Sequence, residues 1–330
     1  MKTEISTDRN AAVELLRNGQ VVALPTETVY GLAADALNPI AVTKIFEAKG
    51  RPRFDPLIVH LPEQDWLEKI ADLPALATAS PSDGGQDRQL ILQLGKKFWP
   101  GPLTMILPKR GIVPEIVTAG LDTVAVRISA HPAFAEIIRA FGKPVAAPSA
   151  NRFGRISPTT AKHVLDELDG HISLIIDAGP TTHGIESTIV AVRDGKIDIL
   201  RRGPVTSEQL SAFGKVDIAK EREKISAPGQ LPSHYAPKTP LRIVDDLKSF
   251  APERNKRCAL LAWNPVKNDE RFGAVRNLSE KQDLREAAAN LFRSLRELDE
   301  LDLDLIVAER VPGQELGAAI LDRLQRASHA

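Results

Sequence analysis

Apolar residues recur along the chain with a helical period in some stretches and as short unbroken runs in others. The helical spacing at 8–16, with Asp8 as the capping residue, predicts an α-helix. The run at 21–24 is too short for a helix and predicts a strand buried on both faces. Asn38 followed by Pro39 is typical of a helix start, and the apolar pattern extends this second helix to Lys49. Helices and strands therefore alternate from the beginning of the chain.

The alternation continues through the first two thirds of the sequence. Further strands are predicted at 57–59, 103–107, 123–129, 144–151 and 174–176, helices at 64–70, 132–141 and 158–168, and a hairpin at 186–202. The segment 25–32 is expected to be a polar connection, and 78–88 a mobile surface loop because it has almost nothing to bury. This order of elements indicates an α/β fold, in which ligands collect at strand ends.

A charged, proline-bearing segment at 216–240 predicts a linker between two domains, 1–215 and 241–330. The second domain is expected to be a small α/β unit with strands at 241–244, 259–263 and 304–308 and helices at 281–298 and 316–327. The linker contains His234 and Tyr235, a pair that is unusual in a spacer.

Composition narrows the class of protein. The chain has 330 residues with 43 basic and 43 acidic side chains, so no net charge attracts it to nucleic acid or anionic lipid. Its one cysteine, Cys258, excludes an internal disulfide and lies in an apolar run typical of a buried small hydrophobe. The sequence shows neither a signal peptide nor an apolar segment of the roughly 20 residues that a membrane span needs. We expect a cytoplasmic protein without membrane association.

The first candidate for chemistry is the stretch 48–61. Lys49, Arg51 and Arg53 surround a glycine and a proline, and a buried strand then leads to His60. Clustered cations repel one another, so an anion such as phosphate is their natural partner. The alternative is a solvated basic loop.

Several familiar sites are absent from the sequence: it has no Walker loop, no dinucleotide fingerprint, no zinc-ligand spacing and no serine-hydrolase elbow. What remains is a set of polar residues at the predicted strand ends: Thr28, Arg51, His60, Arg127, Ser149, Asn151, Ser187 and Arg201. If they converge, they supply cations and hydroxyls but no evident covalent nucleophile. Such a set favours phosphoryl or nucleotidyl transfer, in which catalysis is largely positioning and charge stabilisation.

Six motifs together resemble the Sua5/YrdC/YwlC family, the threonylcarbamoyl-AMP synthases. They are Pro25-Thr-Glu-Thr-Val-Tyr-Gly-Leu, Lys49-Gly-Arg-Pro with Pro56-Leu-Ile-Val-His, Phe98-Trp-Pro-Gly-Pro-Leu-Thr, Val126-Arg-Ile, Pro148-Ser-Ala-Asn and Glu186-Ser-Thr-Ile-Val. Pro228-Gly, His234-Tyr-Ala-Pro and Gly317-Ala-Ala-Ile-Leu-Asp-Arg-Leu resemble the longer Sua5 type. The resemblance implies a YrdC-like open twisted mixed sheet with flanking helices, followed by a small C-terminal Rossmann-like α/β domain.

The resemblance also implies an activity. Members of this family are nucleotidyltransferases that make threonylcarbamoyl-adenylate from L-threonine, bicarbonate or CO2, and ATP with Mg2+, releasing pyrophosphate. The product passes to the tRNA threonylcarbamoyl transferase complex, which modifies the adenosine beside the anticodon. Mg2+ is expected to arrive with ATP, and no protein ligand is assigned to it. Any direct contact with tRNA is expected to be local and weak.

Site residues follow from the matching motif positions. The resemblance assigns to L-threonine Thr28, His60, Arg127, Ala147 and Ser187. It assigns to ATP Arg51, Asp55, Thr123, Ser149, Asn151, Ser157 and Arg201, with His234 and Tyr235 in a segment that folds over the nucleotide. Lys49 and Arg51 are the catalytic pair, because their charges can offset the charge that develops on the phosphates. Asp55 departs from the Asn of many relatives, and a carboxylate there would repel phosphate unless it holds Mg2+ or a hydroxyl.

Two other classes of protein share some of these sequence features. A double-stranded RNA or tRNA-binding module without ATP turnover would use Lys49, Arg51 and Arg53 on backbone phosphates, and the zero net charge weighs against it. A carbamoyl-transfer domain of hydrogenase maturation would need cysteine-rich metal modules, which one cysteine cannot build. The C-terminal domain is expected to position the linker and close the site.

Overall fold

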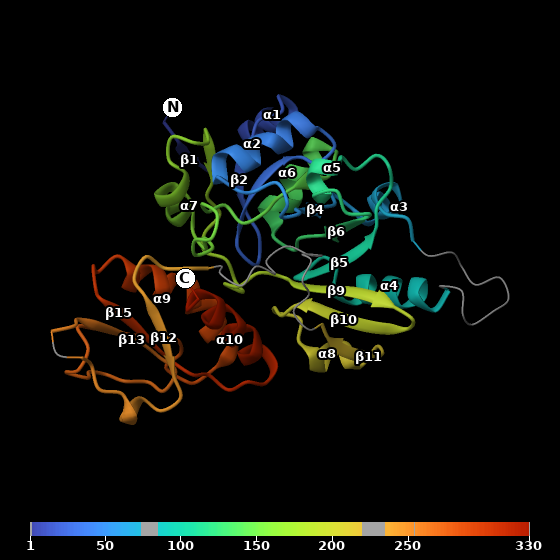
Figure 1. The fold of residues 1–330 in the computed structure, drawn as a ribbon. Helices are drawn as coiled ribbons and strands as arrows, with labels where there is room; N and C mark the ends of the chain where they lie inside the picture. The colour runs from blue at the N-terminus through green and yellow to red at the C-terminus, as the bar shows by residue number, and fades with distance from the viewer. Residues whose placement is uncertain (1, 74–84, 220–234, 254, 330) are drawn as a thin grey trace.

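The computed structural model describes residues 2–73, 85–219, 235–253 and 255–329, which form two α/β parts (Figure 1). Strands of the first part are β1 (Glu4–Ser6), β2 (Val22–Pro25), β3 (Tyr30–Asp35), β4 (Ile58–His60), β5 (Leu103–Pro108), β6 (Thr123–Arg127), β7 (Val145–Ala146), β8 (Leu174–Ile176), β9 (Thr188–Arg193), β10 (Lys196–Arg201) and β11 (Lys215–Ile218). Its helices are α1 (Arg9–Arg17), α2 (Pro39–Lys49), the 3-10 helix η1 (Gln64–Trp66), α3 (Leu67–Ile70), α4 (Gly85–Phe98), α5 (Glu115–Thr118), α6 (Pro132–Phe141), α7 (Ala161–Leu168) and α8 (Ser207–Ser211).

The predicted caps set the start of both early helices. The Asp8 side chain accepts hydrogen bonds from backbone N–H groups in the first turn of α1, and Asn38 does the same for α2. Helix α2 ends at Gly50, whose φ of 60° is the left-handed conformation that glycine adopts readily. Lys49 therefore closes the helix, and Arg51 stands on the loop after it.

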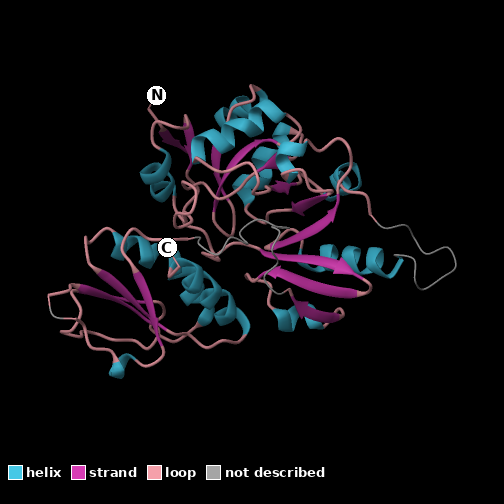
Figure 2. Ribbon diagram, viewed as in Figure 1, coloured by secondary structure: helices cyan, strands magenta, loops and turns pink. Residues whose placement is uncertain are grey.

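The strands of the first part make one mixed sheet in the order β1-β8-β2-β3-β7-β4-β6-β5-β9-β10-β11. Helices α1 and α6 cover one face, whereas α2, α4, α5 and α7 pack on the other (Figure 2). Successive residues of β2 enter opposite cores: Leu24 packs with α1 and α6, and Ala23 packs on the α2 side. Burial on both faces explains the unbroken apolar run at 21–24.

Three differences from the sequence-based expectations stand out. The segment 25–32 was expected to be a connection, but its last three residues begin strand β3, which pairs antiparallel with β2. The loop predicted at 78–88 lies mostly outside the described residues, but 85–88 are helical in α4, so that part was wrong. Within this helical stretch, the Asp87 carboxylate accepts hydrogen bonds from the backbone N–H groups of the β9–β10 turn. Strand β11 lies partly in the predicted linker and pairs with β10.

The second part is smaller and has a parallel sheet in the order β12-β15-β13-β14. Its elements are β12 (Leu241–Val244), the 3-10 helix η2 (Leu247–Ser249), β13 (Cys258–Ala262), β14 (Ala274–Asn277), α9 (Leu284–Asp299), β15 (Leu305–Glu309) and α10 (Glu315–Ala327). Cys258 is buried in a core of apolar side chains, as predicted. Helices α9 and α10 lie between this sheet and the first part (Figure 1). The fold class is confirmed: an open mixed sheet with flanking helices, and a separate small parallel α/β unit.

Candidate active site

A cavity of about 550 Å³, its open mouth included, lies at the ends of β4 and β6. Its lining includes these sequence-predicted residues: Thr28, Arg51, His60, Arg127, Ala147, Ser149, Ser187, Arg201 and Tyr235. The remaining lining residues are Thr26, Val29, Gly31, Pro56, Ile58, Pro148 and Glu186. The structure thus brings together positions that are spread over more than half of the sequence.

His60 and Arg127 are neighbours because β4 and β6 run parallel and these two residues are register partners. Both are the last residues of their strands, so both side chains lie at the same edge of the sheet. The His60 ring packs against Phe134 of α6, with ring centroids 4.9 Å apart. Burial, helped by the nearby Arg127 charge, lowers the pKa of His60 to about 3. The imidazole is therefore neutral at neutral pH and can accept one hydrogen bond while donating another.

Arg127 is held by protein groups on several sides. Its guanidinium donates hydrogen bonds to Thr28 Oγ1 at 3.0 Å and to the Gly101 carbonyl at 3.2 Å. An Nη2 atom also lies 2.6 Å from a carboxylate oxygen of Glu27. Burial alone would raise the pKa of Glu27, but the Arg127 charge and a hydrogen bond from Ser129 hold it at about 2. Arginine has further N–H donors, so this anchored guanidinium can still receive a carboxylate from the cavity.

Glu27 is a site residue that the sequence reading did not single out. It lies in the Pro25-Thr-Glu-Thr motif, where a charged side chain in a turn between buried strands was the available signal. Its carboxylate does not line the cavity, and its contacts show that it fixes Arg127 from behind.

Arg51 is only 8% exposed, so the solvated basic loop is wrong for this residue. It forms a 2.9 Å ion pair with Asp55, which is 0% exposed, and donates a 2.9 Å hydrogen bond to the Pro56 carbonyl. Burial raises the pKa of Asp55, and the Arg51 charge opposes that rise. Asp55 does not line the cavity, so its observed contact is with Arg51. Arg53 is exposed, in line with the absence of any motif requirement at that position.

Lys49, unlike Arg51, does not line the cavity. It is 2% exposed and its Nζ donates hydrogen bonds to the Ser149 carbonyl at 2.6 Å and the Asn151 carbonyl at 2.5 Å. Burial and the nearby Arg51 charge lower its pKa well below the usual value. The side chain is not among the cavity-lining residues, and its contacts fix the backbone that presents Ser149.

Arg201 and Ser187 form another part of the cavity lining. The Arg201 guanidinium donates to Ser187 Oγ and to the Ser187 carbonyl, both at 3.1 Å. Ser187 Oγ also lies 2.8 Å from Thr104 Oγ1 of β5. Arg201 is buried, so the ordinary reading of a solvated charge at a hairpin end does not hold for it.

Three more of the predicted residues, Thr123, Asn151 and Ser157, lie outside the cavity lining. Thr123 begins β6, at the far end of the strand from Arg127. Asn151 donates from its amide to carbonyls of the loop that follows it, and Ser157 donates to the Glu186 carboxylate. His234 lies outside the described residues. Tyr235 is fully buried with a φ of 65°, lines the cavity and stacks on Phe292 of α9, with centroids 5.4 Å apart.

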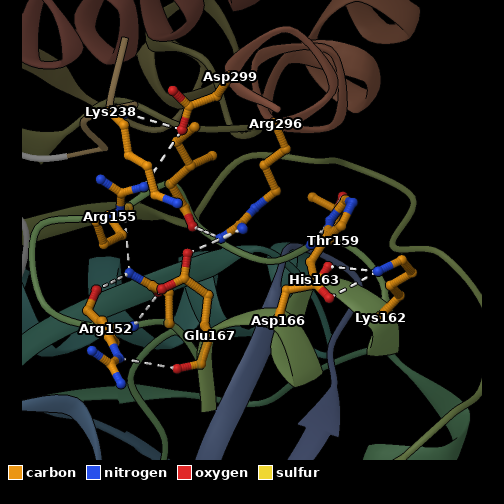
Figure 3. Close-up of polar contacts among 12 residues, drawn as sticks. Arg152, Arg155, Thr159, Lys162, His163, Asp166, Glu167, Lys238, Arg296 and Asp299 are labelled. Atoms are coloured by element: carbon orange, nitrogen blue, oxygen red, sulfur yellow. Dashed lines mark hydrogen bonds and ion pairs between the residues drawn. The ribbon is translucent and has the colours of Figure 1, made fainter. Parts of the chain in front are cut away.

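Helix α9 docks the second part against the first. Figure 3 shows Arg296 reaching Glu167 of α7 and Asp299 reaching Arg155, at N–O distances of 3.1 Å and 3.4 Å. Asp299 also accepts hydrogen bonds from backbone N–H groups at the end of the linker, including Lys238 at 3.0 Å (Figure 3). Gly184 lies against the same helix, where an added Cβ would be only 2.4 Å from the Ala288 carbonyl. The two parts therefore meet closely beside the cavity.

Within the described ranges, no cluster of His, Cys, Asp and Glu side chains could hold a metal ion, and no helix is long and apolar enough to cross a membrane. Among the described lining residues, the one carboxylate is Glu186, and it is paired with Arg323. A divalent cation in this cavity would therefore need ligands from its substrate.

Comparisons with known proteins identify the family. Residues 14–203 match the family described as "Telomere recombination" (Sua5, YciO and YrdC), and 205–329 match "Threonylcarbamoyl-AMP synthase, C-terminal domain". The chain is also 41% identical to the threonylcarbamoyl-AMP synthase of Bacillus subtilis, over 96% of this chain and 92% of that protein. The chain belongs to the Sua5/YciO/YrdC family. The resemblance inferred from the motifs is thus confirmed.

Further relatives support the longer Sua5 type. The threonylcarbamoyl-AMP synthase of Pyrococcus abyssi is 38% identical over 96% of this chain and 93% of that protein. The crystal structure of P. abyssi Sua5 complexed with L-threonine superposes with a TM-score of 0.85 and 36% identity, covering 97% of this chain and 94% of that one. Both parts of the fold, and their arrangement, are therefore shared with a Sua5 protein.

Proposed function

We propose that this chain is an L-threonylcarbamoyladenylate synthase, a nucleotidyltransferase that uses L-threonine, bicarbonate or CO2, and ATP with Mg2+. The observation that carries the proposal is one cavity lined by a neutral His60, an anchored Arg127 and two further buried arginines, Arg51 and Arg201. We assign L-threonine to the His60–Arg127 end of this cavity and the phosphates of ATP to Arg51 and Arg201. The relatives' names and the motifs support the same reading.

At the first end, the carboxylate of L-threonine binds Arg127, whose orientation Glu27 and Thr28 already fix. His60 is neutral, so it can accept a hydrogen bond from the substrate without repelling its ammonium group. Ala147 is buried and apolar, and it supplies a small surface against the substrate's methyl group.

At the other end, Arg51 and Arg201 meet the phosphates of ATP, and Ser149 and Tyr235 contact the rest of the nucleotide. The threonine amine adds to CO2 and gives a carbamate after losing a proton. A carbamate oxygen then forms a bond to the α-phosphorus while the bond to the leaving pyrophosphate breaks. Mg2+ binds the phosphates of ATP and offsets their charge. The buried cations stabilise charge that develops during this displacement.

An RNA-binding module is not favoured by the geometry. Lys49 and Arg51 would have to reach backbone phosphates of a duplex, yet both are buried and hydrogen-bonded within the protein. We propose instead that the small-molecule product leaves for the transferase complex that modifies tRNA.

The test is a mass-spectrometric assay for threonylcarbamoyl-adenylate with each substrate omitted in turn. We expect the product and pyrophosphate only when L-threonine, bicarbonate, ATP and Mg2+ are all present. A folded protein that makes no product in the complete mixture would refute the proposed function.

A further inference from the structure

Arg323 is a buried charge that the reaction described above does not use. It belongs to α10 of the C-terminal part and is 0% exposed. Its Nε lies 2.8 Å from a carboxylate oxygen of Glu186, and its Nη2 donates a 2.9 Å hydrogen bond to the Arg202 carbonyl. The centre of its guanidinium lies 5.0 Å from the centroid of the Tyr235 ring, in the geometry of a cation–π contact.

Each of these contacts ends on the wall of the cavity. Glu186 and Tyr235 line it, and the carbonyl of Arg202 immediately follows the lining residue Arg201. Glu186 also accepts a hydrogen bond from Ser157, a residue assigned to ATP by the family resemblance. One side chain from the second part thus contacts both flanks of the β9–β10 hairpin and the Tyr235 ring.

We propose that Arg323 is a positioning residue for the nucleotide end of the active site, through which the C-terminal part keeps Glu186 and Tyr235 in their binding positions. This inference rests on the proposed function, because it concerns how the same cavity accepts ATP. Arg323 itself does not line the cavity, so it acts through its neighbours.

The ion pair between Arg323 and Glu186 neutralises a carboxylate on the cavity wall. Burial favours a protonated Glu186, but the charges of Arg323 and Arg201 lower the pKa of its carboxyl below the usual value. An ionised carboxylate on the wall of a phosphate site would repel ATP unless a cation compensates it. Arg323 supplies that cation from behind the wall, and its planar guanidinium can pair with the carboxylate and stack on the Tyr235 ring at once.

Docking of the two parts does not depend on Arg323 alone. Arg296 and Asp299 of α9 hold the loop and helix around Arg155 and Glu167 (Figure 3). Arg296 also donates a hydrogen bond to the Ile156 carbonyl, but it makes no direct contact with Glu186. Removing Arg323 should therefore leave the C-terminal part in place while loosening the cavity wall. Removing Arg296 should weaken docking without touching a cavity-lining side chain.

The experiment uses the full-length chain and the variants R323M, R323K and R296M, with R293M as an exposed control on α9. For R323M we expect the KM for ATP to rise at least ~10-fold, as is typical when a buried ionic partner is lost. The KM for L-threonine should stay within about twofold of wild type, because the contacts of Arg323 with Glu186, Arg202 and Tyr235 leave His60 and Arg127 untouched. R323K should recover part of the ATP affinity, and R293M should match wild type.

A double variant, E186Q with R323M, separates charge compensation from loss of fold. It removes both charges, so it should fold even if R323M does not, and its KM for ATP should lie between those of wild type and R323M. Calorimetric binding of ATP is measured in parallel. A wild type that binds ATP but makes no product refutes the proposed function alone. Unchanged ATP affinity in R323M, an equal loss for both substrates, or the same ATP defect in R296M overturns the role of Arg323.

Discussion

Glu27 lies 2.6 Å from the guanidinium of Arg127, so the side chain proposed to bind L-threonine is itself held by a buried carboxylate. The Glu27→Gln variant keeps the shape and removes the charge. We expect the KM for L-threonine to rise roughly 10-fold, since a charge-assisted contact that orients Arg127 is weakened. The KM for ATP should change little. Steady-state titration of each substrate separately measures this, and an effect confined to ATP would contradict the placement of Glu27.

The same ion pair predicts a loss of stability in acid. The folded-state pKa of Glu27 is about 2, below the ordinary value of 4.5, so its stabilising contribution is present above pH 4.5. That contribution is lost as the pH falls from 4.5 toward 2, because the carboxylate must then be protonated. Thermal unfolding in this window should show a shallower loss of Tm for Glu27→Gln than for wild type. Parallel curves of Tm against pH for the two proteins would show that the ion pair between Glu27 and Arg127 does not stabilise the fold.

The two ends of the cavity should respond to different substitutions. Thr28→Val removes a hydroxyl that contacts Arg127, so it should impair L-threonine use and spare ATP use. Arg51→Met alone would strand the buried Asp55 carboxylate, so we pair it with Asp55→Asn. The double variant should lose roughly 100-fold in kcat/KM for ATP, because charge stabilisation at the phosphates is lost. Swapped substrate effects in these two proteins would show that the assignments are reversed.

His60 should make the protein less stable below neutral pH. Its folded-state pKa of about 3 is far below the ordinary 6.5, so the folded state binds fewer protons between these values. Stability is complete above pH 6.5 and falls as the pH drops toward 3, by at most ~1.4 kcal/mol per pH unit from this group.

The measurement is the free energy of denaturant unfolding between pH 5 and 7, at about one-unit steps. His163 has a pKa lowered to about 4 by burial and adds a slope of the same sign, so wild type must be compared with a variant. His60→Gln should flatten the slope, and the exposed His171→Gln serves as control. If the free energy of unfolding changed with pH at the same slope in all three proteins, the pKa of His60 would not be lowered in the folded state.

Much of the fold could be predicted from the sequence because its signals are local. Asp8 and Asn38 cap helices through contacts within one turn, and the buried strands ending at His60 and Arg127 are short apolar runs. Strand β3 was missed because its sequence, Tyr-Gly-Leu-Ala-Ala-Asp, has no β-branched residue and contains Gly, Ala and Asp, which are depleted in strands. Its polar neighbours made the whole segment read as a connection.

The site could be predicted less fully, because several roles depend on contacts that the sequence does not encode locally. The motif shows Asp55, but not that its carboxylate turns toward Arg51 instead of the cavity. Lys49 was expected beside the reacting phosphates, whereas its Nζ is directed at two backbone carbonyls. Arg323 lies in a segment that marked only the type of C-terminal domain, and its partner Glu186 is 137 residues away.

Removal of the C-terminal part tests how far it contributes to the active site. A cut at the domain boundary expected from the sequence, residue 215, would divide β11, which extends to Ile218 and pairs with β10. The truncated chain should therefore end at residue 219. This chain keeps the whole first sheet while losing Tyr235, Phe292 and Arg323.

We expect the truncated chain to bind L-threonine with affinity close to wild type, because Arg127 and its partners Glu27 and Thr28 all lie before the cut. The KM of the truncated chain for ATP should rise more than in R323M, because the cavity-lining residue Tyr235 is also lost. Isothermal titration with each ligand, after circular dichroism has shown a folded protein, measures both effects. Full ATP affinity in this chain would show that the C-terminal part does not shape the site, whereas loss of both ligands together would show that it holds the first sheet in its native form.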